Sequence, residues 1–136
     1  MKIELPSIQA QQRFIIETAT KEAIDQLIEN LKAPTLPPQT DINEDQYPRT
    51  HLLREAEGWQ APHPDVIRAY FRHFQAHFPE YDSDAKLAKL LGLSDSRRIR
   101  AYINDEKKIP YGIWRRFLVL TGRAPQEIIK ILAYMG

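Results

Sequence analysis

The feature that most constrains this fold is a glycine between two short apolar repeats, in the segment DAKLAKLLGLSDSRRIRAYINDEKKIP (residues 84–110). Gly92 can adopt the left-handed conformation that ends a helix, and Ala88 is small enough for a second helix to cross closely. We expect Leu93 to enter the core and Ser94 to cap the next helix. The segment therefore predicts two helices, about 83–91 and about 95–104, joined by a tight turn.

The second of these helices has an apolar and a polar face. Ile99, Tyr102 and Ile103 recur at helical spacing and should be buried. The outer side carries arginine, which can bond both acceptors of a guanine, asparagine, which can pair with adenine, and serine, which suits either base or phosphate. Basic side chains in the next loop and helix would add phosphate contacts. The candidate DNA-contacting residues are Ser94, Asp95, Ser96, Arg97, Arg98, Arg100, Asn104, Lys107, Lys108 and Arg115.

The rest of the C-terminal half also has helical periodicity. One helix is predicted over residues 64–78, where Pro64 takes the first position and a strongly apolar stripe ends near Pro79. Further helices are predicted over residues 110–121, closed by Gly122, and 125–135, opened by Pro125. No alternating strand pattern is found. Residues 63–136 are therefore predicted to form an all-α domain of about five helices.

The N-terminal half has a different character. Ile16, Ile24, Leu27, Ile28 and Leu31 predict one long amphipathic helix within an arm of residues 1–33, which prolines stop at about residue 33. Residues 34–62 are expected to be a linker with a short helix near 49–57, and the acidic residues of its first part are expected to be solvated. Trp59 could dock this segment onto the helices or meet a partner. The acidic residues are Asp41, Glu44 and Asp45.

Charge and composition narrow the function classes. Residues 1–62 carry 6 Lys and Arg against 10 Asp and Glu, whereas residues 63–136 carry 13 against 8, so the basic charge coincides with the predicted polar helix face. The chain has no cysteine, which excludes disulfides, thiolate zinc sites and a cysteine nucleophile. His73 and His77 have a helical i, i+4 spacing but lack the glutamate of a zincin motif, so we expect no metal. No glycine loop that would cradle a phosphate is present, and we expect no cofactor.

At this point the sequence resembles the lambda-repressor-like (Cro/C1, XRE) helix-turn-helix family. The matching residues are Leu87, Ala88, Leu91, Gly92, Leu93, Ser94, Ile99 and Pro110, within roughly residues 64–121. The resemblance implies a five-helix lambda-repressor-like DNA-binding domain, here preceded by the N-terminal helix and proline-rich linker, which acts as a dimer on a palindromic operator. One departure stands out: Ala88 and Ile99 are eleven residues apart, about one more than the family has. The extra residue belongs to the turn or to the start of the second helix.

Three hypotheses for function follow. The first is a sequence-specific regulator of transcription, a repressor, that binds double-stranded DNA as a homodimer, with the N-terminal helix either pairing with its copy or packing on its own domain. The second is an antitoxin that represses its own operon while the acidic arm neutralises a toxin. The third is a helical protein-binding adaptor. An enzyme is not expected, because no nucleophile, base and orienting group can be assembled. Without a signal peptide or a long apolar run, the expected location is the cytoplasm.

Overall fold

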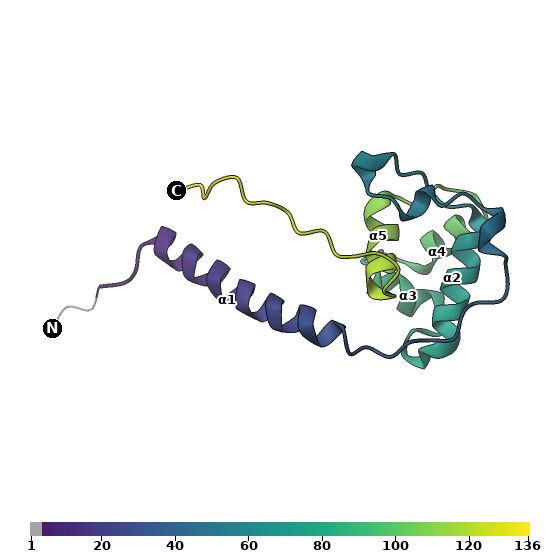
Figure 1. The fold of residues 1–136 in the computed structure, drawn as a ribbon, viewed down its shortest axis with the longest axis horizontal. Helices are drawn as coiled ribbons and strands as arrows, with labels where there is room; N and C mark the ends of the chain where they lie inside the picture. Colours follow the sequence, from purple (N-terminus) through teal and green to yellow (C-terminus); the bar gives the residue numbers. More distant parts are fainter. Residues whose placement is uncertain (1–3) are drawn as a thin grey trace. The chain divides into compact units, whose positions relative to one another are not determined.

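The computed structural model describes residues 4–136, and this part of the chain contains five α-helices and no strand (Figure 1). The all-α prediction is thus confirmed. None of the described helices is both long and apolar enough to span a membrane. The helices are α1 (Ile8–Asn30), α2 (Pro64–His77), α3 (Asp84–Leu90), α4 (Ser96–Ile103) and α5 (Tyr111–Leu120), with short 3-10 turns at Glu44–Gln46, Thr50–Leu52, Glu55–Glu57 and Pro79–Tyr81.

The chain divides into two compact units. The larger one spans residues 37–128 and contains α2 to α5, and the smaller one combines residues 1–36 with residues 129–136. The larger unit begins at Pro37, so most of the segment predicted as a linker belongs to the same unit as the helices.

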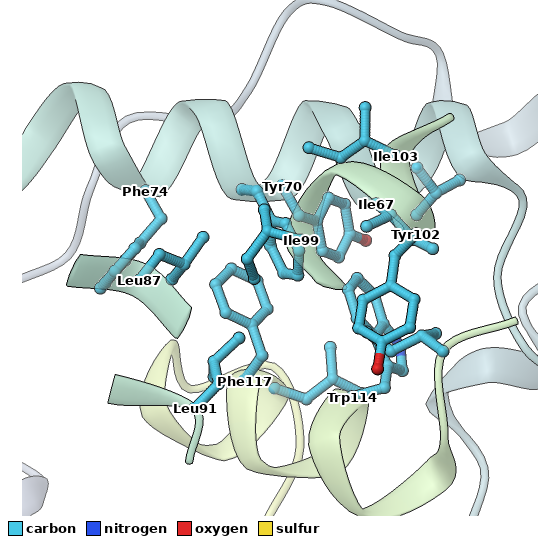
Figure 2. Packing of buried hydrophobic residues seen from close by; sticks show 14 of the residues in the cluster. Ile67, Tyr70, Phe74, Leu87, Leu91, Ile99, Tyr102, Ile103, Trp114 and Phe117 are labelled. Atoms are coloured by element: carbon cyan, nitrogen blue, oxygen red, sulfur yellow. The ribbon is translucent and has the colours of Figure 1, made fainter. Parts of the chain in front are cut away.

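The core of the larger unit lies between α2, α3, α4 and α5 (Figure 2). Trp114 of α5 is fully buried and stacks on Tyr70 of α2 at 5.6 Å and on Phe117 at 5.6 Å between ring centroids. Phe71 meets Phe117 edge to face at 4.9 Å. Offset and edge-on aromatic pairs of this kind stabilise a core beyond the area that they bury. The α2 stripe predicted from the sequence therefore supplies one wall of the core.

The ends of α2 follow from local chemistry. Pro64 occupies the first turn, where its missing N–H costs no hydrogen bond, and the His63 side chain accepts from the backbone N–H of Asp65 at 3.0 Å. The helix ends at His77 because Pro79 follows closely. These bounds agree with the predicted helix 64–78 to within one residue.

The predicted helix 125–135 is wrong. The structure has no regular secondary structure there, and side chains of α5 hold its beginning: Arg115 Nη2 donates to the Pro125 carbonyl at 2.9 Å, and the Tyr111 hydroxyl donates to Glu127. The large apolar residues that follow are exposed, as Leu132 and Met135 at 90% show. A helix of this length is marginal in water without an apolar surface to pack against.

The helix α1 forms as predicted and is capped by Ser7, whose hydroxyl accepts from the Ala10 backbone N–H at 3.1 Å. It buries none of its residues. Phe14 and Ile15 fall outside the predicted apolar stripe, because Phe14 to Ile16 are consecutive and spread over about 200° of the helix circumference. Large apolar side chains such as Phe14 and Ile24 are 69% and 52% exposed.

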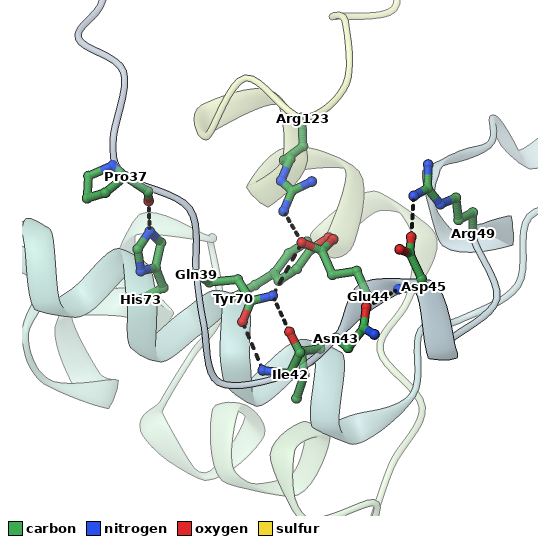
Figure 3. A network of polar contacts seen from close by, with 10 residues as sticks. All are labelled: Pro37, Gln39, Ile42, Asn43, Glu44, Asp45, Arg49, Tyr70, His73 and Arg123. Atoms are coloured by element: carbon green, nitrogen blue, oxygen red, sulfur yellow. Dashed lines mark hydrogen bonds and ion pairs between the residues drawn. The ribbon is translucent and has the colours of Figure 1, made fainter.

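The segment before α2 packs on the helices instead of remaining solvated. Glu44 accepts from the Tyr70 hydroxyl and from Arg123 Nη2 at 2.8 Å, which corrects the expectation of a fully solvated acidic linker at this residue (Figure 3). The predicted short helix at 49–57 consists of two 3-10 turns separated by the extended Leu53 and Arg54.

Trp59 also belongs to this docked segment. Its indole N–H donates to the His51 carbonyl at 3.1 Å, and its ring meets Tyr111 of α5 edge to face at 5.3 Å. Of the two roles considered for Trp59, docking of the N-terminal segment onto the helices is the one that the structure displays.

Candidate nucleic-acid interface

The turn between α3 and α4 has the geometry that the sequence predicts. Gly92 has a φ of 77°, in the left-handed region that favours glycine. The Leu93 N–H donates to the Ala88 carbonyl at 2.8 Å and the Gly92 N–H donates to the Lys89 carbonyl at 3.2 Å, which closes the C-terminal end of α3. Leu93 packs partly buried against the core, and Ala88 is 1% exposed. The two helices therefore approach closely at the positions expected.

The cap of α4 lies one residue later than predicted. Asp95, and not Ser94, is the N-cap, because the Asp95 carboxylate accepts from the Arg97 backbone N–H at 2.8 Å. Ser94 is exposed and belongs to the turn. The helix α4 therefore begins at Ser96. Asp95 also places a negative charge at the positive end of the helix, the position that a phosphate would otherwise take.

The two faces of α4 are as predicted. Ile99, Tyr102 and Ile103 are between 0% and 5% exposed. The outer side chains are exposed except Ser96, which is half-buried and accepts from Arg100 Nη2 at 3.4 Å. At 100° per residue, Arg97, Arg100 and Asn104 lie on one side of the helix, and Arg98 lies at its edge.

A polar network connects α2 to the start of α3. Arg72 Nη1 donates to Asp84 Oδ1 at 2.6 Å and to Gln75 Oε1 at 2.7 Å, and Gln75 Nε2 donates to Asp84 at 3.4 Å. Burial opposes ionisation of Asp84, but Arg72, Gln75 and the field of Arg100 outweigh it, so the pKa of Asp84 lies below its ordinary value. A negative charge on Asp84 thus holds α2 and α3 together and lies within the field of α4.

The basic residues of α4 are largely free of carboxylates. Within the described part of the chain, no carboxylate lies within ion-pair distance of Arg98, Arg100, Lys107 or Lys108. Arg97 makes a long ion pair, 3.8 Å from its Nε to Asp95, with its side chain 85% exposed. Unpaired guanidinium groups on one helix face are suited to anionic or acceptor-rich partners.

The loop after α4 presents Lys107 and Lys108 to solvent. Asp105 has a φ of 60°, a left-handed conformation that aspartate tolerates, and the Glu106 N–H donates back to the Ala101 carbonyl at 2.8 Å. Asp105 and Glu106 are exposed as well, so this four-residue stretch has no net charge. Positive charge is therefore concentrated on α4 more than on its loop.

Arg115 is not placed for a phosphate contact, which corrects the sequence prediction. It is 8% exposed, and its guanidinium donates to the carbonyls of Leu52 at 3.4 Å and Pro125 at 2.9 Å. The sequence held the signal for this, since Arg115 lies four residues after Tyr111 and three before the buried Leu118, on the inner face of α5.

Two further exposed basic residues, Lys89 and Arg116, lie near this surface. Arg116 follows Arg115 and donates to the Leu90 carbonyl at 3.1 Å, at the C-terminal end of α3. Lys89 lies in the last turn of α3, directly before the turn that leads into α4. Lys89 was not predicted, because the apolar pattern of this helix points only to its buried side.

The rings of His73 and His77 both contact backbone carbonyls. His73 Nε2 lies 2.7 Å from the Pro37 carbonyl and His77 Nδ1 lies 2.9 Å from the His73 carbonyl. Among the described residues, no group of three or more histidine and acidic side chains is arranged to hold a metal ion. The His73 ring thus links α2 to Pro37, the first residue of the larger unit.

Comparison with protein-family models, with curated proteins and with solved structures gives no match for this chain.

Proposed function

We propose that residues 37–128 form a DNA-binding unit that reads duplex DNA with α4 and regulates transcription, as a repressor. The observation that carries the proposal is the division of α4 into a buried apolar face and an exposed face with Arg97, Arg100 and Asn104. A helix presented in this way after a short helix and tight turn fits the major groove, and these three side chain types bond base edges there.

The basic residues outside the centre of the face would position the protein without reading sequence. Arg98 lies at the edge of α4, and Lys107 and Lys108 follow in the loop. Long cationic side chains at the rim of a reading helix contact phosphates, and their contribution depends on salt. Arg116 joins this group in place of the buried Arg115. A dimer would place two such helices about one turn of DNA apart, on a two-fold symmetric site.

The proposal is tested by selecting binding sites from random duplex DNA and then comparing variants on the selected duplex. Arg100→Ala should weaken specific binding by about 1 to 3 kcal/mol and relax the preference at one base position. Lys108→Ala should weaken binding to all duplexes alike. Arg54→Ala is a matched control, because Arg54 is exposed and lies outside the proposed interface. Failure of the full chain to enrich any duplex would overturn the proposal.

A second candidate is an antitoxin that also binds a protein partner. The smaller unit favours it, because α1 buries none of its residues and apolar residues of the C-terminal segment are exposed, as Ile129 at 87% shows. An exposed apolar surface of this kind is typical of a protein interaction site. The partner would be bound by this unit, since the acidic segment first considered for that role is held by Tyr70 and Arg123. A protein that co-purifies with the full chain but not with a chain lacking residues 1–33 would support this candidate.

A further inference from the structure

A cavity of about 340 Å³ lies between the segment of residues 39–52, Val66 of α2 and Arg123 after α5. Its volume is at the lower end of the range for small-molecule sites. Ile42 and Leu52 contribute apolar lining. In Figure 3, Glu44 and Asp45 lie between the guanidinium groups of Arg123 and Arg49, which all line this cavity.

His51 is a buried histidine among the residues that line this cavity. It is 5% exposed and lines the cavity, and its Nδ1 accepts from Trp114 Nε1 at 3.1 Å. An indole N–H can only donate, so the proton of the neutral His51 ring lies on Nε2. Within the described residues no hydrogen bond uses Nε2. Burial lowers the pKa of His51 to about 4, and the ring is therefore a neutral donor at neutral pH.

Three of the four carboxylate oxygens of Glu44 and Asp45 already accept hydrogen bonds. Glu44 Oε1 accepts from the Tyr70 hydroxyl, and Glu44 Oε2 accepts from Arg123 at 2.8 Å and from Gln39 at 3.3 Å. The Asp45 carboxylate accepts from Arg49 at 2.9 Å. Each guanidinium group has about five N–H donors, of which these bonds use one. The hydrogen-bonding capacity left in the cavity is therefore mainly that of donors.

We propose that this cavity binds a small oxygen-rich anion, a molecule bearing a carboxylate or a phosphate, between His51 Nε2–H and the guanidinium groups of Arg49 and Arg123. Guanidinium groups bind both kinds of oxyanion in a forked geometry. Arg49 can turn to such a ligand at little cost, because the side chains of its pair with Asp45 are 72% and 78% exposed. This proposal does not depend on DNA binding.

The two tryptophans allow a direct test in the full chain. Trp114 donates to His51 Nδ1 and Trp59 donates to the His51 carbonyl, so both indole N–H resonances report on this residue. The protein is titrated with sodium phosphate and separately with sodium succinate, while sodium chloride at matched ionic strength serves as the reference. We expect a saturable shift of the Trp114 indole resonance with at least one of the two anions and none with chloride. If only one of the two anions gives a saturable shift, that anion shows whether the site takes a phosphate or a carboxylate.

The variants decide whether the shift comes from this cavity. Arg49→Gln should weaken the apparent affinity about tenfold, the loss expected for one charge-assisted hydrogen bond. Arg54→Gln should leave it unchanged, since Arg54 is exposed and does not line the cavity. Both variants should keep the wild-type dispersion of the two indole resonances. A shift that fails to saturate with either anion, or that is equal in Arg49→Gln and wild type, would overturn the proposal.

Discussion

Trp114 donates its indole N–H to Nδ1 of His51 at 3.1 Å, across 63 residues of sequence. The bond is buried and joins α5 to the segment that precedes α2. The His51 ring also meets Tyr70 and Trp114 edge to face, at 6.0 Å and 5.7 Å between centroids. A segment rich in proline and acidic residues is thereby anchored in the aromatic core.

Acidification should weaken the fold through His51. Burial lowers the pKa of His51 from 6.5 to about 4, while Glu44 partly opposes this effect and Arg123 adds to it. Because the folded state favours the neutral ring, its contribution to stability is complete above pH 6.5 and is lost as the pH falls from there towards 4. The linked loss approaches about 3 kcal/mol, at roughly 1.4 kcal/mol per pKa unit. Urea unfolding between about pH 7.5 and pH 4.5 measures it.

His51→Gln provides the comparison for that experiment, since it removes the titrating ring. Its unfolding free energy should be lower than that of the wild type at neutral pH but should change less across the same window. Parallel pH profiles for the two proteins would show that His51 is not the titrating group.

Glu44 should stabilise the fold more than its neighbour Asp45. Glu44→Ala removes the acceptor of Tyr70 and Arg123, and we expect a loss of about 1 to 3 kcal/mol in the free energy of unfolding. Asp45→Ala breaks only an exposed ion pair with Arg49 and should change stability by less than about 0.5 kcal/mol. Chemical denaturation of the two variants at neutral pH makes the comparison. Equal losses of unfolding free energy in the two variants would contradict a stabilising role of the Glu44 contacts.

The contribution of Glu44 should also depend on pH. Burial opposes its ionisation, but the bonds to Tyr70, Arg123 and Gln39 outweigh burial and lower its pKa below 4.5. A lowered carboxyl pKa contributes stability above the unfolded value that is lost as the pH falls below it. The difference between wild type and Glu44→Ala should therefore shrink below about pH 4.5, a lower window than that of His51.

The same substitution at two glycines should have opposite effects. Gly92→Ala places a side chain at a φ of 77° and should lower the free energy of unfolding by about 1 kcal/mol or more. The cost is one of backbone conformation alone, because no atom crowds the added Cβ. Gly112→Ala lies in the first turn of α5, also in open space, and should raise helix stability by up to about 1 kcal/mol. Thermal unfolding of both variants tests the turn geometry. A Gly92→Ala protein as stable as the wild type would contradict a left-handed residue between α3 and α4.

How much of this molecule could be predicted from its sequence depends on the range of the interactions. The helices from α2 to α5 follow from apolar spacing, Pro64, Gly92 and Gly122, which act within a few residues. The docking of Glu44 could not be predicted, because it depends on Tyr70 and Arg123, which are 26 and 79 residues away in the chain.

The candidate site shows the same limit. The periodicity of α4 is local, and it separated the buried from the exposed residues correctly. Arg115 was misplaced because its charge was given more weight than its position between the buried Trp114 and Leu118. The helix over 125–135 was predicted from Pro125 and the apolar residues after it, but whether such residues find a surface to pack on is a tertiary property.

Arg115→Met should affect the fold and leave the DNA interface intact. The buried guanidinium holds the Leu52 and Pro125 carbonyls, so its loss should lower the free energy of unfolding by about 1 to 3 kcal/mol. If duplex binding exists, its salt dependence should not change, because Arg115 contacts no phosphate in our account. If Arg115→Met reduces the salt dependence of duplex binding without changing stability, Arg115 contacts a phosphate after all and this prediction is wrong.

The central claim is that α4 and its basic surroundings bind duplex DNA, and the salt dependence of binding tests it most directly. Fluorescence anisotropy of a labelled duplex, selected from random sequences, is measured with the full chain from about 50 to about 200 mM salt. We expect the logarithm of the binding constant to fall with the logarithm of salt with a slope of about −4 per protomer, for roughly four phosphate contacts, and Lys108→Ala to reduce the magnitude of this slope by about 1. No binding at the lowest salt, or binding that does not change with salt, would contradict the account.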